Sequence, residues 1–202
     1  MKSDEQKNES SSATRPAVRA DARRNFDALL QAAMAVFSEL GVDAPMRTIA
    51  DRAGVGVGTL YRHFPERSDL IKALIKRDVL AQADAAAAYA EELEPAEALA
   101  KWMTRLVDFI STKKALGPAL HSGDPAYQAL PEFVLGQFTP VLRRLLDAAA
   151  ASGAIRNDVN ASDLLNAGLR LATPSSDGDT EQARRMVSLL TDGLRHRPNP
   201  KS

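Results

Sequence analysis

Hydrophobic residues recur along most of this chain at steps of three and four positions, the spacing that places them on one face of a helix. The first such segment runs from about Ala20 to Leu40, and Gly41 follows it as a residue able to adopt positive φ. The apolar positions on its inner face are Phe26, Leu29, Leu30, Ala33 and Phe37. No segment alternates between apolar and polar residues as a half-buried strand would, so the pattern predicts an all-α protein.

Three further helices are predicted before the middle of the chain. Two short ones, at 45–53 and 55–64, are separated by Gly54, and Pro65 ends the second. A longer helix is expected over 66–93, because its apolar residues keep the helical spacing. The two short helices around a glycine have the form of a helix-turn-helix.

The second half contains four more predicted helical segments, at about 95–113, 125–151, 161–173 and 179–196. The expected architecture is therefore all-α with about nine helices. It divides into a disordered tail at 1–17, a three-helix domain at 18–65 and a larger helical domain at 66–198. The third helical segment should be capped by Ser162 or Asp163.

Composition and charge narrow the class of protein. There is no cysteine, which excludes disulfides, thiolate metal sites and cysteine nucleophiles and favours a reducing, cytoplasmic compartment. We expect neither a signal peptide nor a membrane span, because no long uncharged apolar stretch occurs. The net charge of zero conceals an asymmetry: residues 15–77 sum to +4, and residues 78–202 to −3. A polyanion would dock on the first part.

The segment from Thr48 to Phe64 is the most informative. Ile49, Ala50, Ala53, Val55 and Leu60 are suited to packing the two short helices together. The outward face of the second helix then carries hydrogen-bonding groups and no carboxylate, and a short helix of this kind fits the DNA major groove.

This segment resembles the DNA-binding domain of the TetR family of bacterial regulators. The family pattern is matched by Ile49-Ala50, by Ala53-Gly54-Val55 and by the run from Gly58 to Phe64. The resemblance covers about residues 22–72. One departure is that many members have a Ser or Thr cap before the second helix, where this chain has Ala44-Pro45, so that Asp43 or no side chain caps it.

The resemblance implies a DNA-binding surface. Gly58 and Thr59 would lie at the groove floor, while Tyr61 and His63 would donate to phosphates, although either could instead pack in the core. Arg67 would bind a phosphate at the start of the following helix. The full predicted set is Arg47, Thr48, Gly58, Thr59, Tyr61, Arg62, His63 and Arg67. Flanking phosphates or a minor groove could be met by Arg15, Arg19, Arg23 and Arg24, which could equally be solvated.

The last two helices are expected to form a homodimer interface, as the resemblance implies, and the alternative is a monomer with these faces folded inward. The predicted interface residues are Leu164, Leu165, Gly168, Leu169, Met186, Leu189, Leu190 and Leu194. A pocket for an apolar or weakly polar effector could be lined by Trp102, Leu106, Phe109, His121, Tyr127, Phe133 and Phe138, which could also be ordinary core.

These features predict a repressor that binds a palindromic operator as a dimer and is released by a small molecule. The alternatives are a DNA-binding regulator without small-molecule control, or an activator. An enzyme is disfavoured, since no Ser-His-Asp order, carboxylate pair or phosphate loop is present. His121 and His196 have no second ligand at metal-binding spacing, so neither a metal nor another cofactor is expected.

Overall fold

The structure is a computed structural model that describes residues 14–173 and 179–195. Within these residues the chain forms nine α-helices and two short 3-10 helices, with no strand, which confirms the all-α prediction. Residues 1–13 of the predicted tail and His196 lie outside the described residues. The chain divides into two compact units, Met1–Leu74 and Ile75–Ser202, which are described separately.

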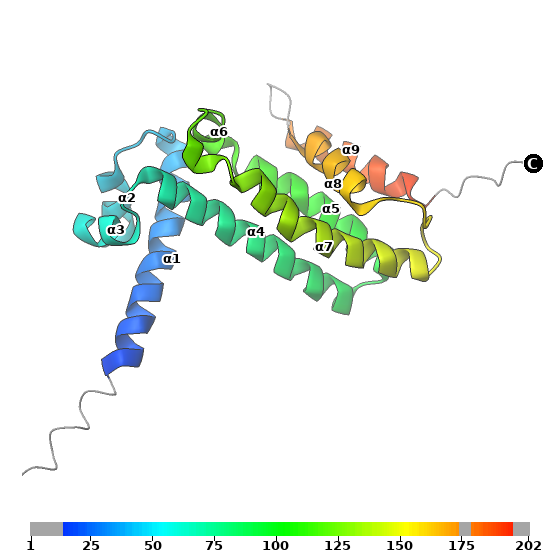
Figure 1. Ribbon diagram of the computed structural model, residues 1–202, viewed down its shortest axis with the longest axis horizontal. Coiled ribbons are helices and arrows are strands. Elements are labelled where there is room, and N and C mark those ends of the chain that lie inside the picture. Colours follow the sequence, from blue (N-terminus) through cyan, green and yellow to red (C-terminus); the bar gives the residue numbers. More distant parts are fainter. Residues whose placement is uncertain (1–13, 174–178, 196–202) are drawn as a thin grey trace, which may run out of the picture. The chain divides into compact units, whose positions relative to one another are not determined.

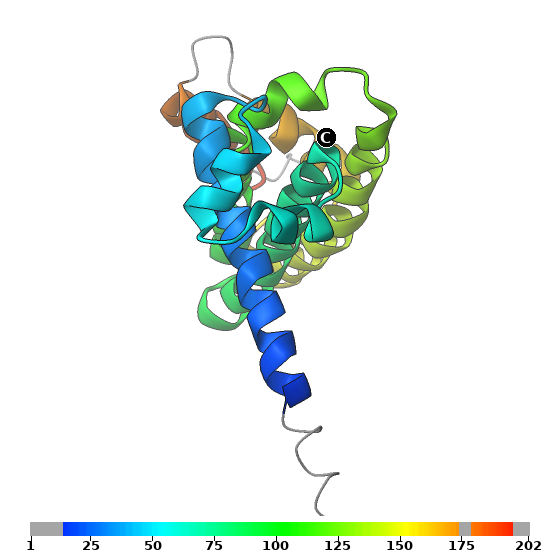
Figure 2. The ribbon, with the colours of Figure 1, turned by 90° about the vertical axis from the view of Figure 1, so that its left-hand side faces the viewer.

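Unit 1 contains α1 (Thr14–Leu40), α2 (Met46–Ala53), α3 (Val57–His63) and the first turns of α4 (Arg67–Glu92). Helix α1 already includes residues 14–17, so the helix begins earlier than the apolar pattern indicates. Helix α2 packs against both α1 and α3, as Figure 2 shows. Fully buried side chains from all four helices form the core, among them Leu29, Phe37, Ile49, Leu60, Leu70 and Leu74.

The connections in unit 1 are set by glycines in the left-handed region. Gly41 ends α1 with φ of 83°, and Gly54 ends α2 with φ of 69°. At the second turn, the amides of Gly54 and Val55 donate to the carbonyls of Asp51 and Ala50. At the other end of α2, Pro45 is the N-cap residue and no side chain caps the helix, which is one of the two alternatives that the sequence left open.

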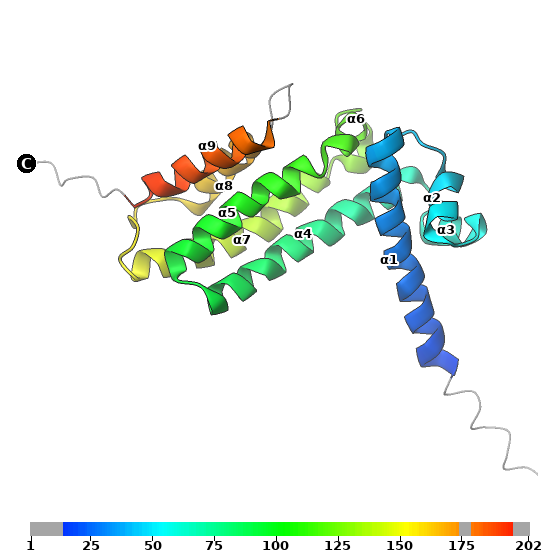
Figure 3. The ribbon, with the colours of Figure 1, turned by 180° about the vertical axis from the view of Figure 1, so that it is seen from behind.

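Unit 2 contains the rest of α4, α5 (Pro95–Ser111), η1 (Lys114–Leu116), α6 (Gly117–Leu120), η2 (Pro125–Tyr127), α7 (Leu130–Ala151), α8 (Ala161–Ala172) and α9 (Thr180–Gly193). Helix α5 packs against α7, α8 and α9, and is seen from both sides in Figures 1 and 3. The segment predicted as one helix at 125–151 is divided, because the α-helix begins only at Leu130.

The predicted cap of α8 at Ser162 or Asp163 is wrong by two to three residues. The N-cap residue is Asn160, whose side-chain oxygen accepts from the amides of Ser162 and Asp163 at 2.8 and 3.3 Å. Ser162 and Asp163 therefore supply the amides that are capped rather than the capping oxygen. In the described part of the chain, no helix has the length and apolar character needed to cross a membrane.

Candidate nucleic-acid interface

Helix α3 is anchored in unit 1 by a small part of its surface. Leu60 is fully buried, and Phe64, directly after the helix, is 3% exposed. The N-cap residue is Gly56, whose carbonyl accepts from the amide of Thr59 at 2.8 Å. The rest of the helix faces away from the core of unit 1, so its side chains are free to meet another molecule.

The outward face carries the predicted contact residues. Gly58, Tyr61 and Arg62 are exposed, while Thr59 and His63 are half-buried. Tyr61 is 49% exposed, which excludes the alternative that it belongs to the core. No carboxylate occurs between Val57 and His63, so nothing within the helix would repel a phosphate.

Gly58 has no structural reason to be glycine within unit 1. Its φ is not positive, and a Cβ atom added there would meet no other atom within 4 Å. Glycine disfavours helix formation relative to alanine, so its presence in the first turn of α3 weakens the helix. The missing side chain leaves the backbone of α3 uncovered on this exposed face.

Arg62 lies along its own helix. Its guanidinium donates to the hydroxyl oxygen of Thr59 at 2.9 Å and to the carbonyl of Gly58 at 3.2 Å. It forms no ion pair with any described residue, so its charge is available to an external anion or base edge. Thr59 and Arg62 thus form one polar patch at the start of α3.

His63 combines packing with partial exposure. Its ring lies edge-on to Phe26, with 6.0 Å between ring centroids, and 6.1 Å from Phe64. Phe26 and Phe64 are themselves in contact at 5.2 Å. Because His63 is half-buried against this aromatic pair, it links α1 to the end of α3 and keeps one edge toward solvent.

Arg67 is engaged within unit 1. Its Nη1 donates to the carbonyls of Val42 and Ala44 at 2.5 and 2.7 Å, and its Nη2 to that of Asp43 at 3.4 Å. These carbonyls belong to the loop between α1 and α2. The sequence indicated a phosphate contact for Arg67, whereas these bonds tie the first turn of α4 to the loop that precedes α2.

The other basic residues of unit 1 differ in their partners. Arg47 is 82% exposed and lies 4.0 Å from Asp51, a contact that leaves it accessible. Arg52 donates to Glu39 at 2.6 Å and so joins α2 to α1. This hydrogen bond lowers the pKa of the Glu39 carboxyl. Arg47 and the half-buried Thr48 of α2 therefore remain accessible, whereas Arg52 is engaged.

The predicted dimer residues fall into two groups. Leu164, Leu165 and Leu194 are buried inside unit 2, and Gly168 faces Met103 so closely that an added Cβ would lie 2.6 Å from its Cε. The close approach at Gly168 is therefore with α5 of the same chain. The predicted residues that keep exposed surface are Leu169, Met186, Leu190 and Leu189, of which Leu189 is 71% exposed.

The predicted pocket residues do not surround one cavity. Trp102, Leu106 and Phe138 have no exposed surface, and the rings of Trp102 and Phe138 are 5.6 Å apart in the core of unit 2. Tyr127 is buried, and Lys76 lies 5.6 Å above the half-buried ring of Phe133. His121 is exposed, and its Nδ1 lies 2.8 Å from the carbonyl of Gly117. Apart from His121, these positions are those of ordinary core and surface residues.

His121 lines a cavity of about 370 Å³ together with Gly117 and Leu120. Phe109 lines a separate cavity between α4 and α5, together with polar residues that helical spacing did not mark. This cavity has a volume of about 220 Å³ and includes Gln82 and Arg105 in its wall. Helical spacing finds apolar faces, so it passes over a glutamine that is 2% exposed. Among the described residues, no group of three or more His, Asp and Glu could hold a metal ion.

Comparison with known proteins agrees with this geometry. Residues 29–74 match the family model described as bacterial regulatory proteins, tetR family. Residues 94–196 match the C-terminal domain of the SbtR-like transcriptional regulators. An HTH-type transcriptional regulator of Staphylococcus aureus (strain USA300) is 43% identical over 63 residues, which are 31% of this chain and 34% of that protein.

Two crystal structures extend the similarity over most of the chain. A TetR transcriptional regulator from Streptomyces coelicolor is 40% identical with a TM-score of 0.70, covering 86% of this chain and 99% of that one. A TetR regulatory protein from Mycobacterium vanbaalenii is 33% identical with a TM-score of 0.70, covering 89% and 99%. With a helix-turn-helix in unit 1 and these matches in both units, the chain belongs to the TetR family of DNA-binding transcriptional regulators.

Proposed function

We propose that this protein is a repressor that binds a palindromic operator as a homodimer, reads it through α3 and is released by a small molecule. The main support for DNA recognition by α3 is the exposed glycine at position 58. Its missing side chain serves no packing within unit 1, and it lies beside Thr59 and Arg62 on a face without carboxylates. Together these groups suit a helix whose first turn meets base edges in the major groove.

Within this proposal, the contact residues have separate roles. Thr59 and Arg62 read bases, since they lie on the first turns of α3, and arginine can donate two hydrogen bonds to guanine. Tyr61 and Arg47 donate to phosphates from exposed positions. Arg67 positions the loop before α2 and does not itself neutralise a phosphate.

The homodimer part rests on the exposed side chain of Leu189 in α9. A leucine exposed by 71% on a helix that otherwise packs on α5 and α8 is expected to be covered in an assembly. Leu169, Met186 and Leu190 keep partial exposure and would extend the same apolar surface. A two-fold dimer would present two α3 helices to successive major grooves of a palindrome.

The cavity between α4 and α5 supports release by a small molecule. It is lined by charged and polar side chains as well as by Phe109, and a ligand there would contact α4, the helix that begins in unit 1. A ligand that favours one position of α4 would shift the population of DNA-binding conformations. The alternatives remain a regulator without small-molecule control, or an activator. We place the protein in the cytoplasm, where its DNA would be.

The test begins with the DNA sequence that the full chain selects. Genomic fragments are bound to the purified protein, recovered and sequenced, and the enriched site is then used in mobility-shift titrations at several salt concentrations. We expect a palindromic site whose affinity falls steeply with salt, with a logarithmic slope of about −11 if each subunit of the dimer neutralises about six phosphates. The absence of any enriched site at low salt would refute DNA reading by α3.

Two variants separate base reading from phosphate binding. Thr59→Ala should change the sequence that is selected, whereas Tyr61→Phe should weaken binding to all sequences similarly by removing one hydroxyl. Reporter expression from the selected site distinguishes a repressor from an activator, because deletion of a repressor raises transcription. Equal sequence preference in Thr59→Ala and the unchanged protein would show that the base contacts lie elsewhere.

A further inference from the structure

The cavity between α4 and α5 has a chemistry that indicates the charge of its ligand. It lies entirely within unit 2, and its volume of about 220 Å³ is below the range of about 300–1,000 Å³ typical of sites for drug-sized ligands. Its wall includes Asp78, Gln82, Arg105, Asp108, Phe109 and Lys113. Both signs of charge are present, so the question is which charges are already paired.

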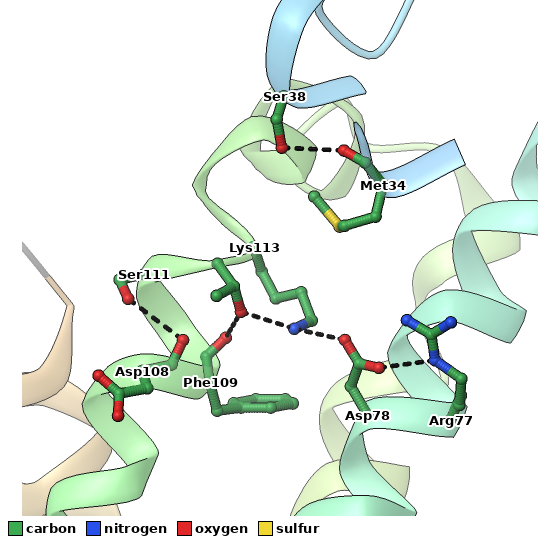
Figure 4. Close-up of polar contacts among 9 residues, drawn as sticks. Met34, Ser38, Arg77, Asp78, Asp108, Phe109, Ser111 and Lys113 are labelled. Carbon is green, nitrogen blue, oxygen red and sulfur yellow. Dashed lines mark hydrogen bonds and ion pairs between the residues drawn. The ribbon is translucent and has the colours of Figure 1, made fainter. Parts of the chain in front are cut away.

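The two carboxylates of the cavity are engaged within the chain. Asp78 accepts from Lys113 at 2.6 Å and from Arg77 at 2.8 Å, as Figure 4 shows. Burial raises the pKa of Asp78, but the hydrogen bonds from Lys113 and Arg77 outweigh it and leave the pKa below its ordinary value. Asp108 accepts from Arg184 of α9 at 2.6 Å. Neither carboxylate is therefore left to attract a cationic ligand.

The cation Lys113 is engaged as well. Besides Asp78, its ammonium donates to the hydroxyl of Thr112 at 2.8 Å and lies 4.9 Å from the centre of the Phe109 ring. Its side chain is only 10% exposed, so these contacts hold it at the edge of the cavity. Lys113 closes one side of the site and lies against the aromatic wall.

Two groups in the cavity wall remain without a partner. Arg105 forms no ion pair and no hydrogen bond with any described residue, although it is one helical turn from Asp108. Gln82 is 2% exposed. Its side-chain Nε2 donates to the backbone carbonyl of Trp102 at 3.3 Å, and its backbone carbonyl accepts from the Trp102 indole at 2.9 Å. The side-chain Oε1 of Gln82 has no partner of its own. Since no fully buried side-chain oxygen among the described residues lacks a hydrogen bond, this atom keeps some accessible surface, and Gln82 belongs to the cavity wall.

We propose that this cavity binds a compact carboxylate that also carries a hydroxyl group. The carboxylate pairs with the guanidinium of Arg105, the hydroxyl donates to Oε1 of Gln82, and the apolar body of the ligand lies against Phe109. The proposal specifies the chemical class of the effector, and a regulatory role for this site rests on the proposed release by a small molecule. It also differs from the sequence-based expectation, because the aromatic residues that suggested an apolar ligand fill the core and leave a polar cavity.

The binding test uses the full chain without DNA and isothermal titration calorimetry. The probes are 4-hydroxybenzoate and 3-hydroxybutyrate, each compared with its neutral amide. We expect at least one carboxylate to bind and its amide to bind at least about tenfold more weakly, since the charge-assisted hydrogen bond is lost. The carboxylate site would be refuted if neither carboxylate gave heat up to about 10 mM, or if an acid and its amide bound with equal affinity.

Matched variants locate the site. Arg105→Gln should weaken carboxylate binding by roughly ten- to hundredfold, the value of a hydrogen bond to a charged group. Arg144→Gln removes an exposed arginine of α7 and should leave binding unchanged. Because Arg105 is exposed and unpaired, its replacement should not affect folding, which circular dichroism verifies. Equal carboxylate affinity in Arg105→Gln and the unchanged protein would refute the assignment.

The two proposals can fail independently. Calorimetry on the DNA-free protein reports the carboxylate site whether or not an operator is found. The mobility shift reports DNA binding whether or not a carboxylate binds. If a carboxylate binds and fails to release the operator, effector control by this site is refuted while the binding site stands.

Discussion

Replacing Gly58 by alanine should stabilise the protein and weaken its binding to DNA. An alanine Cβ at this position would meet no protein atom within 4 Å, and the backbone already has a φ that alanine accepts. Alanine is favoured over glycine by about 1 kcal/mol in a helix interior, and we expect about half of this in the first turn of α3. For a chain of this size, that corresponds to a rise of about 1–2 °C in the unfolding temperature.

The effect on DNA should have the opposite sign. If the backbone at Gly58 approaches the groove floor, the added methyl group would displace α3 and cost at least one base contact. A good base contact contributes about 1–3 kcal/mol, so the affinity for the operator should fall at least about fivefold. Thermal unfolding followed by circular dichroism gives the first quantity, and a mobility-shift titration at fixed salt gives the second.

Gly136 provides the matched control. It lies inside α7, and a Cβ atom there would also meet nothing within 4 Å. Gly136→Ala should therefore stabilise the protein by about 1 kcal/mol without changing its affinity for DNA. The reasoning is wrong if Gly58→Ala binds the operator as tightly as the unchanged protein does, or if it lowers the unfolding temperature.

Other replacements test the remaining features. Arg67→Ala should lower both stability and DNA affinity yet keep the salt dependence of binding, whereas loss of a true phosphate contact from both subunits would reduce the logarithmic slope by about 1.8. Leu189→Glu should shift the protein to a monomer in sedimentation experiments, while Leu80→Glu, at another exposed leucine, should not; dimers in both would refute the α9 interface. Asp78→Asn should lower the free energy of unfolding by about 2 kcal/mol at pH 7. Because the folded-state pKa of Asp78 lies below its ordinary value of 3.8, the stabilisation is present above pH 3.8 and is lost as the pH falls through the folded-state pKa. Urea titrations should therefore show a constant difference from the unchanged protein above pH 3.8 that shrinks as the pH is lowered below it, and a difference that stays constant on acidification would contradict this.

The helices of unit 1 could be predicted because their determinants are local. Apolar spacing, Gly41, Gly54 and Pro65 act within a few residues of the positions that they determine, and the structure places helix ends there. The identity of the exposed face of α3 follows from which residues are apolar. The sequence could not reveal the partners of Arg67, since they lie 23 to 25 residues away along the chain.

The ligand cavity shows more clearly which features the sequence could not predict. A set of aromatic residues at helical spacing has the same appearance whether it fills a core or surrounds a space, and Trp102 and Phe138 fill the core. Which arginine lacks a carboxylate partner depends on contacts between α4, α5 and α9, such as that of Arg184 with Asp108. Charge pairing across helices is a property of the packed molecule and leaves no periodic trace in the sequence.

The bonds of Arg67 bear on how the DNA-reading part of this protein can be transplanted. A fragment ending at residue 65 would leave the carbonyls of Val42 and Ala44 without their donor, beside a helix α2 that no side chain caps. It would also lack Leu70 and Leu74, which complete the core of unit 1. A chimaera that exchanges operator specificity between regulators should therefore be joined after residue 74, within a continuous helix. The helix-turn-helix and the first turns of α4 must therefore be transferred together.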